Sequence, residues 1–185
     1  QEFHPVSLIP LRCQSEPHQV QVIRHQTVGG AEQFLADARV QQQFGASQST
    51  ASAFASVMHR DVSAGQPLAA LLARNAFTVA GETNLRFREG EYELTTFGGA
   101  SLVQGDAPAI ARLQRNSVHY AQRPDRDYDL YDPTRTSYGG YWANSSFART
   151  GGRHWIGSVT GEVQSPGLDT NDIGRLRAAD AMSVN

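Results

Sequence analysis

The chain has 185 residues, 39% of them hydrophobic, and a net charge of -2, so it is long enough for one domain with a sizeable core. Its charges are interspersed, which gives no indication of a nucleic-acid surface, and all 16 basic residues are arginines, which excludes lysine chemistry. The single cysteine, Cys13, excludes an intrachain disulfide and a cysteine-based zinc site. No apolar run predicts a transmembrane helix, whereas alternating membrane strands are not excluded. Because the chain begins at Gln1, we expect a processed or partial product.

The first third of the chain alternates polar and apolar residues, a pattern typical of β-strands. Residues 6–11, flanked by prolines, are expected to form an edge strand or an extended arm. Residues 19–24 predict a strand that meets a turn at Gly29 and Gly30. Residues 34–44 alternate as well, although their composition also favours a helix. The alternation of residues 50–60, after a polar turn, favours a hairpin of two long strands.

The middle of the chain predicts two more strands and a helix. Residues 67–74 fit one or two helical turns. Residues 77–87 and 92–103 predict strands joined by a turn, with Gly98 and Gly99 marking a bulge or bend. Asp106 as N-cap and Pro108 in the first turn predict a helix over residues 107–120.

Residues 138–149 and 154–164 predict a second hairpin, turned by residues 150–153, and the Gly139–Gly140 pair is interpreted as turn or bulge glycine. The expected fold class is mainly β, an antiparallel sheet of long strands with one short helix. Strands that pair a small or apolar face with a charged face fit a barrel whose lumen is wet.

The charged faces of these strands supply the candidate ligand-binding residues. We expect a lumen lined by Asp37, Arg39, Glu82, Arg86 and Glu93, and candidate sugar-stacking rings at Tyr138, Tyr141 and Trp142. Glu82 and Asp37 could instead act as an acid pair of the glycosidase type, but pairing with Arg39 or Arg86 is favoured. No catalytic residue is assigned, and the six scattered histidines are interpreted as surface or hydrogen-bonded residues.

An acidic, arginine-rich loop at residues 123–140 supplies the candidate metal site. Alternate carboxylates can converge on calcium, and the D-x-D-x-D-x-x-D spacing is carried by Asp125, Asp127, Asp129 and Asp132. The EF-hand pattern fails, however, because Leu130 and Thr136 replace its glycine and glutamate. Pairing of the aspartates with Arg123, Arg126 and Arg135 is the favoured alternative, and no other cofactor is indicated.

The same region carries a family pattern. Its elements are Gln114, His119-Tyr120, Gln122-Arg123-Pro124-Asp125, Asp132-Pro133, Thr136, Gly139-Gly140, Ser165-Pro166-Gly167, Asn171-Asp172-Ile173-Gly174 and Asp180. The chain thereby resembles a family of uncharacterised bacterial outer-membrane proteins, whose members typically carry an N-terminal carbohydrate-binding family 9-like module and a long C-terminal β-barrel. The family usually has an aromatic residue where this chain has Leu168.

This resemblance implies a location in the bacterial outer membrane and a barrel segment over residues 31–185, preceded by an extended arm at residues 1–30. The implied partners are membrane lipid, a saccharide ligand, and the remaining barrel strands or a partner chain. An enzyme is not favoured. Two alternatives stay open: a soluble β-rich calcium-dependent hydrolase, and a structural subunit that adds its strands to a partner sheet.

Overall fold

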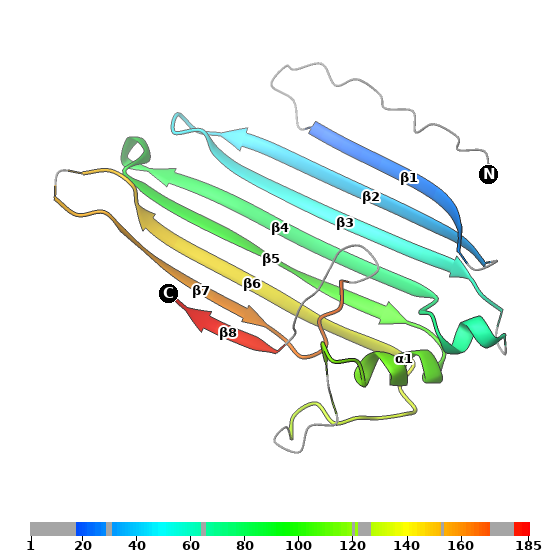
Figure 1. Cartoon of the computed structure of the whole chain (residues 1–185). Helices are drawn as coiled ribbons and strands as arrows, with labels where there is room; N and C mark the ends of the chain where they lie inside the picture. The colour runs from blue at the N-terminus through cyan, green and yellow to red at the C-terminus, as the bar shows by residue number, and fades with distance from the viewer. Residues whose placement is uncertain are drawn as a thin grey trace.

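The computed structural model describes residues 18–28, 31–63, 66–119, 121, 127–152, 154–170 and 180–185, so the strand or arm expected at 6–11 and the turn at Gly29 and Gly30 lie outside the described residues. One long antiparallel sheet dominates the fold, and each strand pairs with the next along the chain (Figure 1). Its strands are β1(His18–Val28), β2(Ala31–Phe44), β3(Ser49–Asp61), β4(Asn75–Phe87), β5(Tyr92–Gln104), β6(Ser137–Arg149), β7(Gly157–Gln164) and β8(Ala181–Val184). Among these strands β1 pairs only with β2, and β8 only with β7, so the sheet is open.

The expected fold class, a mainly β chain with an antiparallel sheet and one short helix, is confirmed. The hairpins predicted at 34–60 and 138–164 are present as β2–β3 and β6–β7. The helical alternative for β2 is wrong, because β2 is a strand that pairs with β1 on one side and β3 on the other. The first strand, β1, pairs with β2 along its whole length, so a boundary after residue 30 falls inside a hairpin of the sheet.

The predicted helix is present but shorter. It is α1(Ala107–Gln114), which ends six residues before the expected position. The side chain of Asn116 accepts hydrogen bonds from the Val118 amide and the Ser117 hydroxyl, a local turn that competes with helix continuation. Asp106 stands at the N-cap, but its carboxylate accepts a bond from the Arg74 guanidinium at 3.0 Å instead of capping the helix. The segment at 67–74 holds a single 3-10 turn, Pro67–Ala70.

The register divides β2 to β8 into two contrasting faces. We call the first the apolar face; its large side chains are mostly exposed, and they are Val40, Phe44, Val57, Phe77, Val79, Phe87, Leu102, Tyr141, Phe147, Val159, Met182 and Val184. The opposite, polar face carries most of the charged residues of these strands, and the exceptions, Glu32, Asp61 and Arg149, stand at strand ends. A sheet in water normally buries its apolar face, so this distribution is the reverse of a soluble sandwich.

The hydrophobic core lies at one end of the polar face, where α1 crosses the sheet (Figure 1). Ile110 of α1 is 1% exposed, and it packs against strand residues that also face this side: Met58, Ala76, Val103 and Tyr138. The long connections, including α1, gather at this end, whereas the strand connections described at the other end are hairpin turns. In the described residues no helix has the length and apolar character needed to span a bilayer.

The interpretation of Gly98 and Gly99 as a bulge is wrong. Strand β5 pairs without interruption with β4 and β6 through both positions. At Gly99 a Cβ atom would lie 2.6 Å from the indole of Trp142 and would also collide with the Val79 carbonyl oxygen. Glycine is therefore required here so that a neighbouring ring can lie close to the strand.

Candidate functional site

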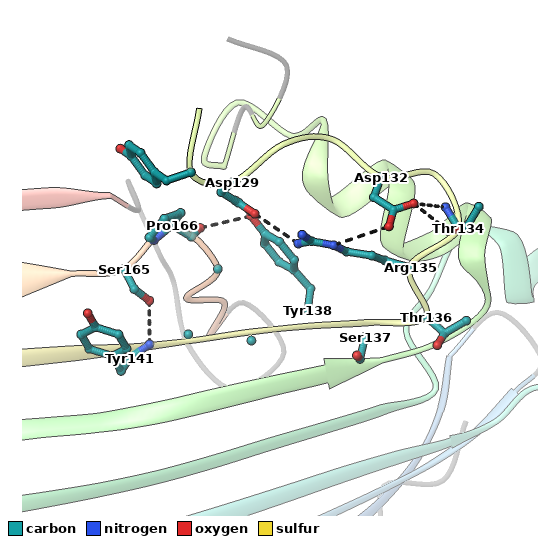
Figure 2. A pocket seen from close by; sticks show the side chains of 14 residues that line it. Asp129, Asp132, Thr134, Arg135, Thr136, Ser137, Tyr138, Tyr141, Ser165 and Pro166 are labelled. Carbon is teal, nitrogen blue, oxygen red and sulfur yellow. Dashed lines mark hydrogen bonds and ion pairs between the residues drawn. The ribbon is translucent and has the colours of Figure 1, made fainter. Parts of the chain in front are cut away.

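A polar cleft of about 680 Å³ opens where the aspartate loop packs against the start of β6 (Figure 2). It is bounded by the loop on one side and by the Ser165–Pro166–Gly167 turn on the other. Its lining residues are Tyr128, Asp129, Asp132, Thr134, Arg135, Thr136, Ser137, Tyr138, Gly139, Gly140, Tyr141, Ser165, Pro166 and Gly167. Seven residues of the family pattern described above thus lie at one place in the fold: Asp132, Thr136, Gly139, Gly140, Ser165, Pro166 and Gly167.

Asp129 connects this loop to the sheet. One carboxylate oxygen accepts a hydrogen bond from the Arg135 guanidinium at 3.1 Å, and the other accepts one from the Tyr138 hydroxyl at 2.6 Å. Asp129 is 9% exposed and Tyr138 is 3% exposed. A buried carboxylate needs such donors, because its desolvation is costly unless each oxygen is paired.

Asp132 shapes the turn beside it. The carboxylate accepts hydrogen bonds from the Thr134 hydroxyl at 2.7 Å and from the Thr134 amide at 2.9 Å, and Arg135 lies 4.0 Å away. The pKa of Asp132 is held below its ordinary value, most of all by the hydrogen bond from the Thr134 hydroxyl. The hydrogen bond from the Thr134 amide has the next largest effect, and the Arg135 charge lowers the pKa further. Since the folded pKa is depressed, the stabilisation is present above the unfolded pKa and is lost as the pH falls through the folded pKa.

The favoured arginine pairing is present in the described part of the loop, since Arg135 contacts both Asp129 and Asp132. Asp125, Arg123 and Arg126 lie outside the described residues, and Asp127 is exposed. Among the described residues, no group of three or more His, Cys, Asp or Glu side chains could hold a metal ion. The four-aspartate calcium site stays a prediction.

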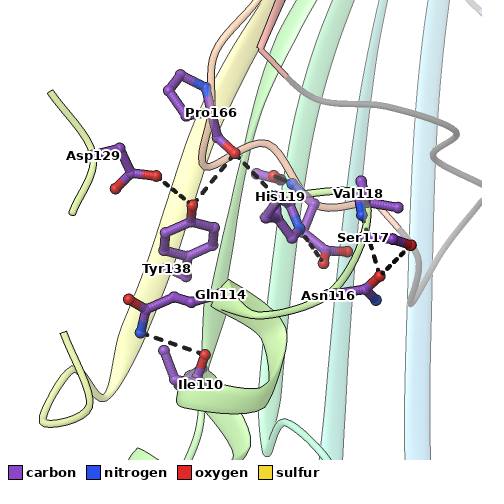
Figure 3. A network of polar contacts seen from close by, with 11 residues as sticks. Ile110, Gln114, Asn116, Ser117, Val118, His119, Asp129, Tyr138 and Pro166 are labelled. Carbon is purple, nitrogen blue, oxygen red and sulfur yellow. Dashed lines mark hydrogen bonds and ion pairs between the residues drawn. The ribbon is translucent and has the colours of Figure 1, made fainter. Parts of the chain in front are cut away.

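A buried polar network anchors the two loops to the sheet (Figure 3). The ring nitrogens of His119 lie 2.9 Å from the Pro166 carbonyl oxygen and 3.1 Å from a carboxylate oxygen of Asp169. Its side chain is 0% exposed, and that of Asp169 is 2% exposed. Because a carbonyl can only accept, the His119 ring nitrogen at 2.9 Å donates to the Pro166 oxygen.

The same network continues to α1 and β5. The amide of Asp169 donates to the Ser101 hydroxyl at 3.0 Å. The Gln114 side chain bonds both backbone groups of Asp132, donating at 2.8 Å and accepting at 2.9 Å. These contacts join segments that are far apart in the sequence, so the network acts as a clamp at this end of the sheet.

Replacing His119 by alanine is expected to lower the free energy of unfolding by about 2 kcal/mol, because Pro166 and Asp169 would each lose a buried hydrogen bond to the imidazole. Chemical denaturation of the two variants measures this. His154→Ala is the matched control, since His154 is exposed and its replacement should change stability by less than about 0.5 kcal/mol. Equal stability of both variants would show that the network does not stabilise the fold.

The interpretation of Gly139 and Gly140 as turn glycines is wrong. They lie inside β6, paired with Leu102 and Ser101 of β5. A Cβ atom on Gly140 would collide with the Leu168 amide nitrogen and the Ser165 hydroxyl, and one on Gly167 with the Gly139 carbonyl oxygen. The glycines thus allow the turn after β7 to cross directly over β6. Leu168, where the family usually has an aromatic residue, is 2% exposed and fills this contact.

The structure places all five predicted lumen residues on the polar face. Arg39 lies 3.8 Å from Glu82, and Arg86 lies 3.7 Å from Glu93. Asp37 lies on β2 and Glu82 on β4, two strand spacings and four residues of register apart, which gives roughly 16 Å between their Cα atoms. Side chains stand roughly perpendicular to a sheet and do not close this gap, so the structure does not bring the two together as an acid pair.

The three candidate stacking rings do not share one surface. Tyr138 is buried and bonded to Asp129. Tyr141 lies on the apolar face and is 56% exposed. Trp142 lies on the polar face, where its ring is 5.8 Å from that of Phe97 at an angle of 54°.

Sequence reasoning missed two aromatic residues that accompany Trp142. Phe54 and Phe97 line a second pocket of about 260 Å³ together with Arg39, Ser52, Thr78, Ala80, Gly81, Glu82, Trp142 and Thr170. The alternation of residues 50–60 already placed Phe54 on the side opposite Ala53 and Ala55. Only the register between strands shows which side chains of β2 to β6 it meets.

No family model, no curated protein and no solved structure matches this chain.

Proposed function

We propose that this chain forms part of the wall of an outer-membrane β-barrel. Its apolar face lies toward lipid, and its polar face lies toward an aqueous lumen that binds or passes a polar ligand such as a saccharide. The observation that carries the proposal is the reversed sheet, whose large apolar side chains are exposed over seven strands. An apolar patch of this extent marks an interaction surface, and the band it forms is typical of membrane barrels.

The aromatic residues of the apolar face support this proposal by their spacing. Phe34 and Phe44 on β2 are ten residues apart, and so are Phe77 and Phe87 on β4. Ten residues of strand span about 33 Å. Girdles of aromatic residues flank the apolar band of membrane barrels at both interfaces with water.

The register between strands shows how these aromatic residues form rows that are inclined to the strands. Phe77 lies opposite Val57, which lies opposite Ala36, so the row shifts by two residues between Phe34 and Phe77. The same shift takes it on to Tyr141 on β6. A shift of two residues over two strands corresponds to a strand tilt of about 35° from the barrel axis. At this tilt, the roughly 33 Å of strand between the two aromatic rows span about 27 Å along the barrel axis. Both values are those of strands that cross a bilayer.

The polar face supports an aqueous lumen. Four of its charged residues, Arg39, Glu82, Arg86 and Glu93, form opposite-charge pairs that remain between 28% and 52% exposed. Pairs of this kind are suited to water and not to lipid. They offer hydrogen-bonding groups to a polar solute.

The open edges indicate the kind of partner. Exposed sheet edges do not occur in the hydrocarbon region, because unpaired backbone groups cannot be satisfied there. Strand β1 has no described neighbour on its outer side, and β8 covers β7 only from Thr160 onward. We therefore expect the sheet to continue into further barrel strands, of the same protein or of a partner chain.

Refolding from urea tests the proposal. We expect cooperative β-structure, followed by far-ultraviolet circular dichroism, in dodecyl maltoside micelles and aggregation in plain buffer, because only micelles cover the apolar face. A chain that folds cooperatively as a monomer in plain buffer would contradict the membrane assignment. Stability in buffer that rises with protein concentration, at a defined stoichiometry, would favour a subunit that adds its strands to another sheet.

A further inference from the structure

The second pocket has the composition of a ligand site. Its 260 Å³ lie on the polar face over the middle of the sheet, away from the polar cleft. One register row across five strands forms its centre, in the order Arg39, Phe54, Ala80, Gly99 and Trp142. The Trp142 indole covers Gly99, and the small residue Ala80 stands between that indole and the Phe54 ring, which explains the hollow.

The aromatic surface of this pocket is held in position. Gly99 leaves room for the Trp142 indole, which lies within 2.8 Å of the place that a Cβ atom would take. Phe97, one row further along β5, packs against the same indole at a centroid distance of 5.8 Å. The rings therefore form a fixed apolar wall inside an otherwise polar face.

The rim of the pocket can form hydrogen bonds. Arg39 and Glu82 approach only to 3.8 Å, and their side chains are 52% and 48% exposed. At this distance they are loosely paired, so both groups can bind hydroxyls of a ligand. Ser52, Thr78 and Thr170 contribute further hydroxyls. One cation and one anion cancel, which favours a neutral ligand.

We propose that this pocket binds a single pyranose ring of a saccharide. A pyranose presents an apolar C–H face, which matches the Trp142 and Phe97 rings, and a rim of neighbouring hydroxyls, which matches Arg39 and Glu82. The inference rests on the proposed function for an aqueous surface at this face. It extends that function by assigning the ligand class and the residues that hold it.

The two tryptophans of the chain allow a direct test. Trp155 lies on the far hairpin and is 77% exposed, so Trp155→Phe leaves Trp142 as the single reporter at the pocket. We expect maltotriose, cellotriose or chitotriose to change the fluorescence of this variant in a saturable way. Sorbitol, a linear polyol without a ring face, should have no effect. The matched variant Trp142→Phe, which reports only from Trp155, should not respond.

Two further substitutions in the Trp155→Phe background identify the contacts. Gly99→Val should abolish the response, because the valine side chain displaces the indole. Glu82→Gln should weaken binding by about tenfold, since a charged acceptor of hydroxyl bonds is lost. Gly161→Val is the control, because a Cβ atom at Gly161 meets nothing within 4 Å.

The outcomes separate this inference from the proposed function. A Trp155→Phe protein that folds only in micelles and responds to none of the three trisaccharides would overturn the saccharide site and leave the membrane proposal standing. A response to sorbitol equal to that of the sugars would also overturn it. Saturable binding by a protein that folds in plain buffer would support the pocket and contradict the membrane assignment.

Discussion

Replacing Ala53 by arginine is expected to lower the free energy of unfolding of the membrane-embedded protein by about 2–4 kcal/mol. Ala53 is exposed on the apolar face of β3, opposite Val40 and Gly81. Val40 lies beside the midpoint between Phe34 and Phe44, and Gly81 lies beside the midpoint between Phe77 and Phe87. Ala53 therefore occupies the proposed middle of the bilayer. Urea unfolding in lipid vesicles, followed by tryptophan fluorescence, measures the loss.

Two arginine substitutions on β2 serve as controls. Gln42→Arg lies on the apolar face but only two residues from Phe44, so it should cost no more than about 1 kcal/mol near the interface. Gln41→Arg lies on the polar face and should change stability by less than about 0.5 kcal/mol. If all three variants lose the same stability, the apolar face does not lie in lipid.

The strands could be predicted because alternation is a local property. In 77–87, every second residue is apolar or small and the intervening residues include Glu82 and Arg86, so the strand and its two faces follow from the sequence. The same rule places Tyr141 and Trp142 on opposite faces of the sheet, although both are candidate sugar-stacking rings. Strand β8 was missed because its four residues, Ala181–Val184, are too short to show a period.

The sites could not be predicted in the same way, because they depend on register and on contacts distant in sequence. The charges favour a pairing of Glu82 with Arg39 or Arg86, but only the pairing of three successive strands shows that Arg39 is the partner. His119 and Asp169 are fifty residues apart, and nothing in their spacing indicates contact. The glycines were misinterpreted for a similar reason. Gly99 and Gly140 are required because other segments lie where a side chain would stand. A rule that assigns glycine to turns does not detect this.

Replacing Gly140 by alanine is expected to lower the free energy of unfolding by about 3 kcal/mol, the upper end for overpacking. The added Cβ atom would collide with the backbone nitrogen of Leu168 and with the Ser165 hydroxyl, and it would lie 2.6 Å from the Gly167 carbonyl carbon. Backbone atoms cannot rotate away, so the turn after β7 must lift from β6. That movement would break the bond between the Tyr141 amide and the Ser165 hydroxyl, which measures 2.7 Å.

Hydrogen exchange distinguishes this local loss from general destabilisation. The amides of Ser165 and Asp169, which donate to Tyr141 and Ser101, should lose protection in Gly140→Ala while the β3–β4 amides keep theirs. Gly161→Ala is the matched control on the neighbouring strand, where a Cβ atom meets nothing within 4 Å and alanine should be neutral or slightly stabilising. Equal protection in both variants would mean that the turn does not rest on β6, and the clamp built on His119 and Asp169 would then lack its support.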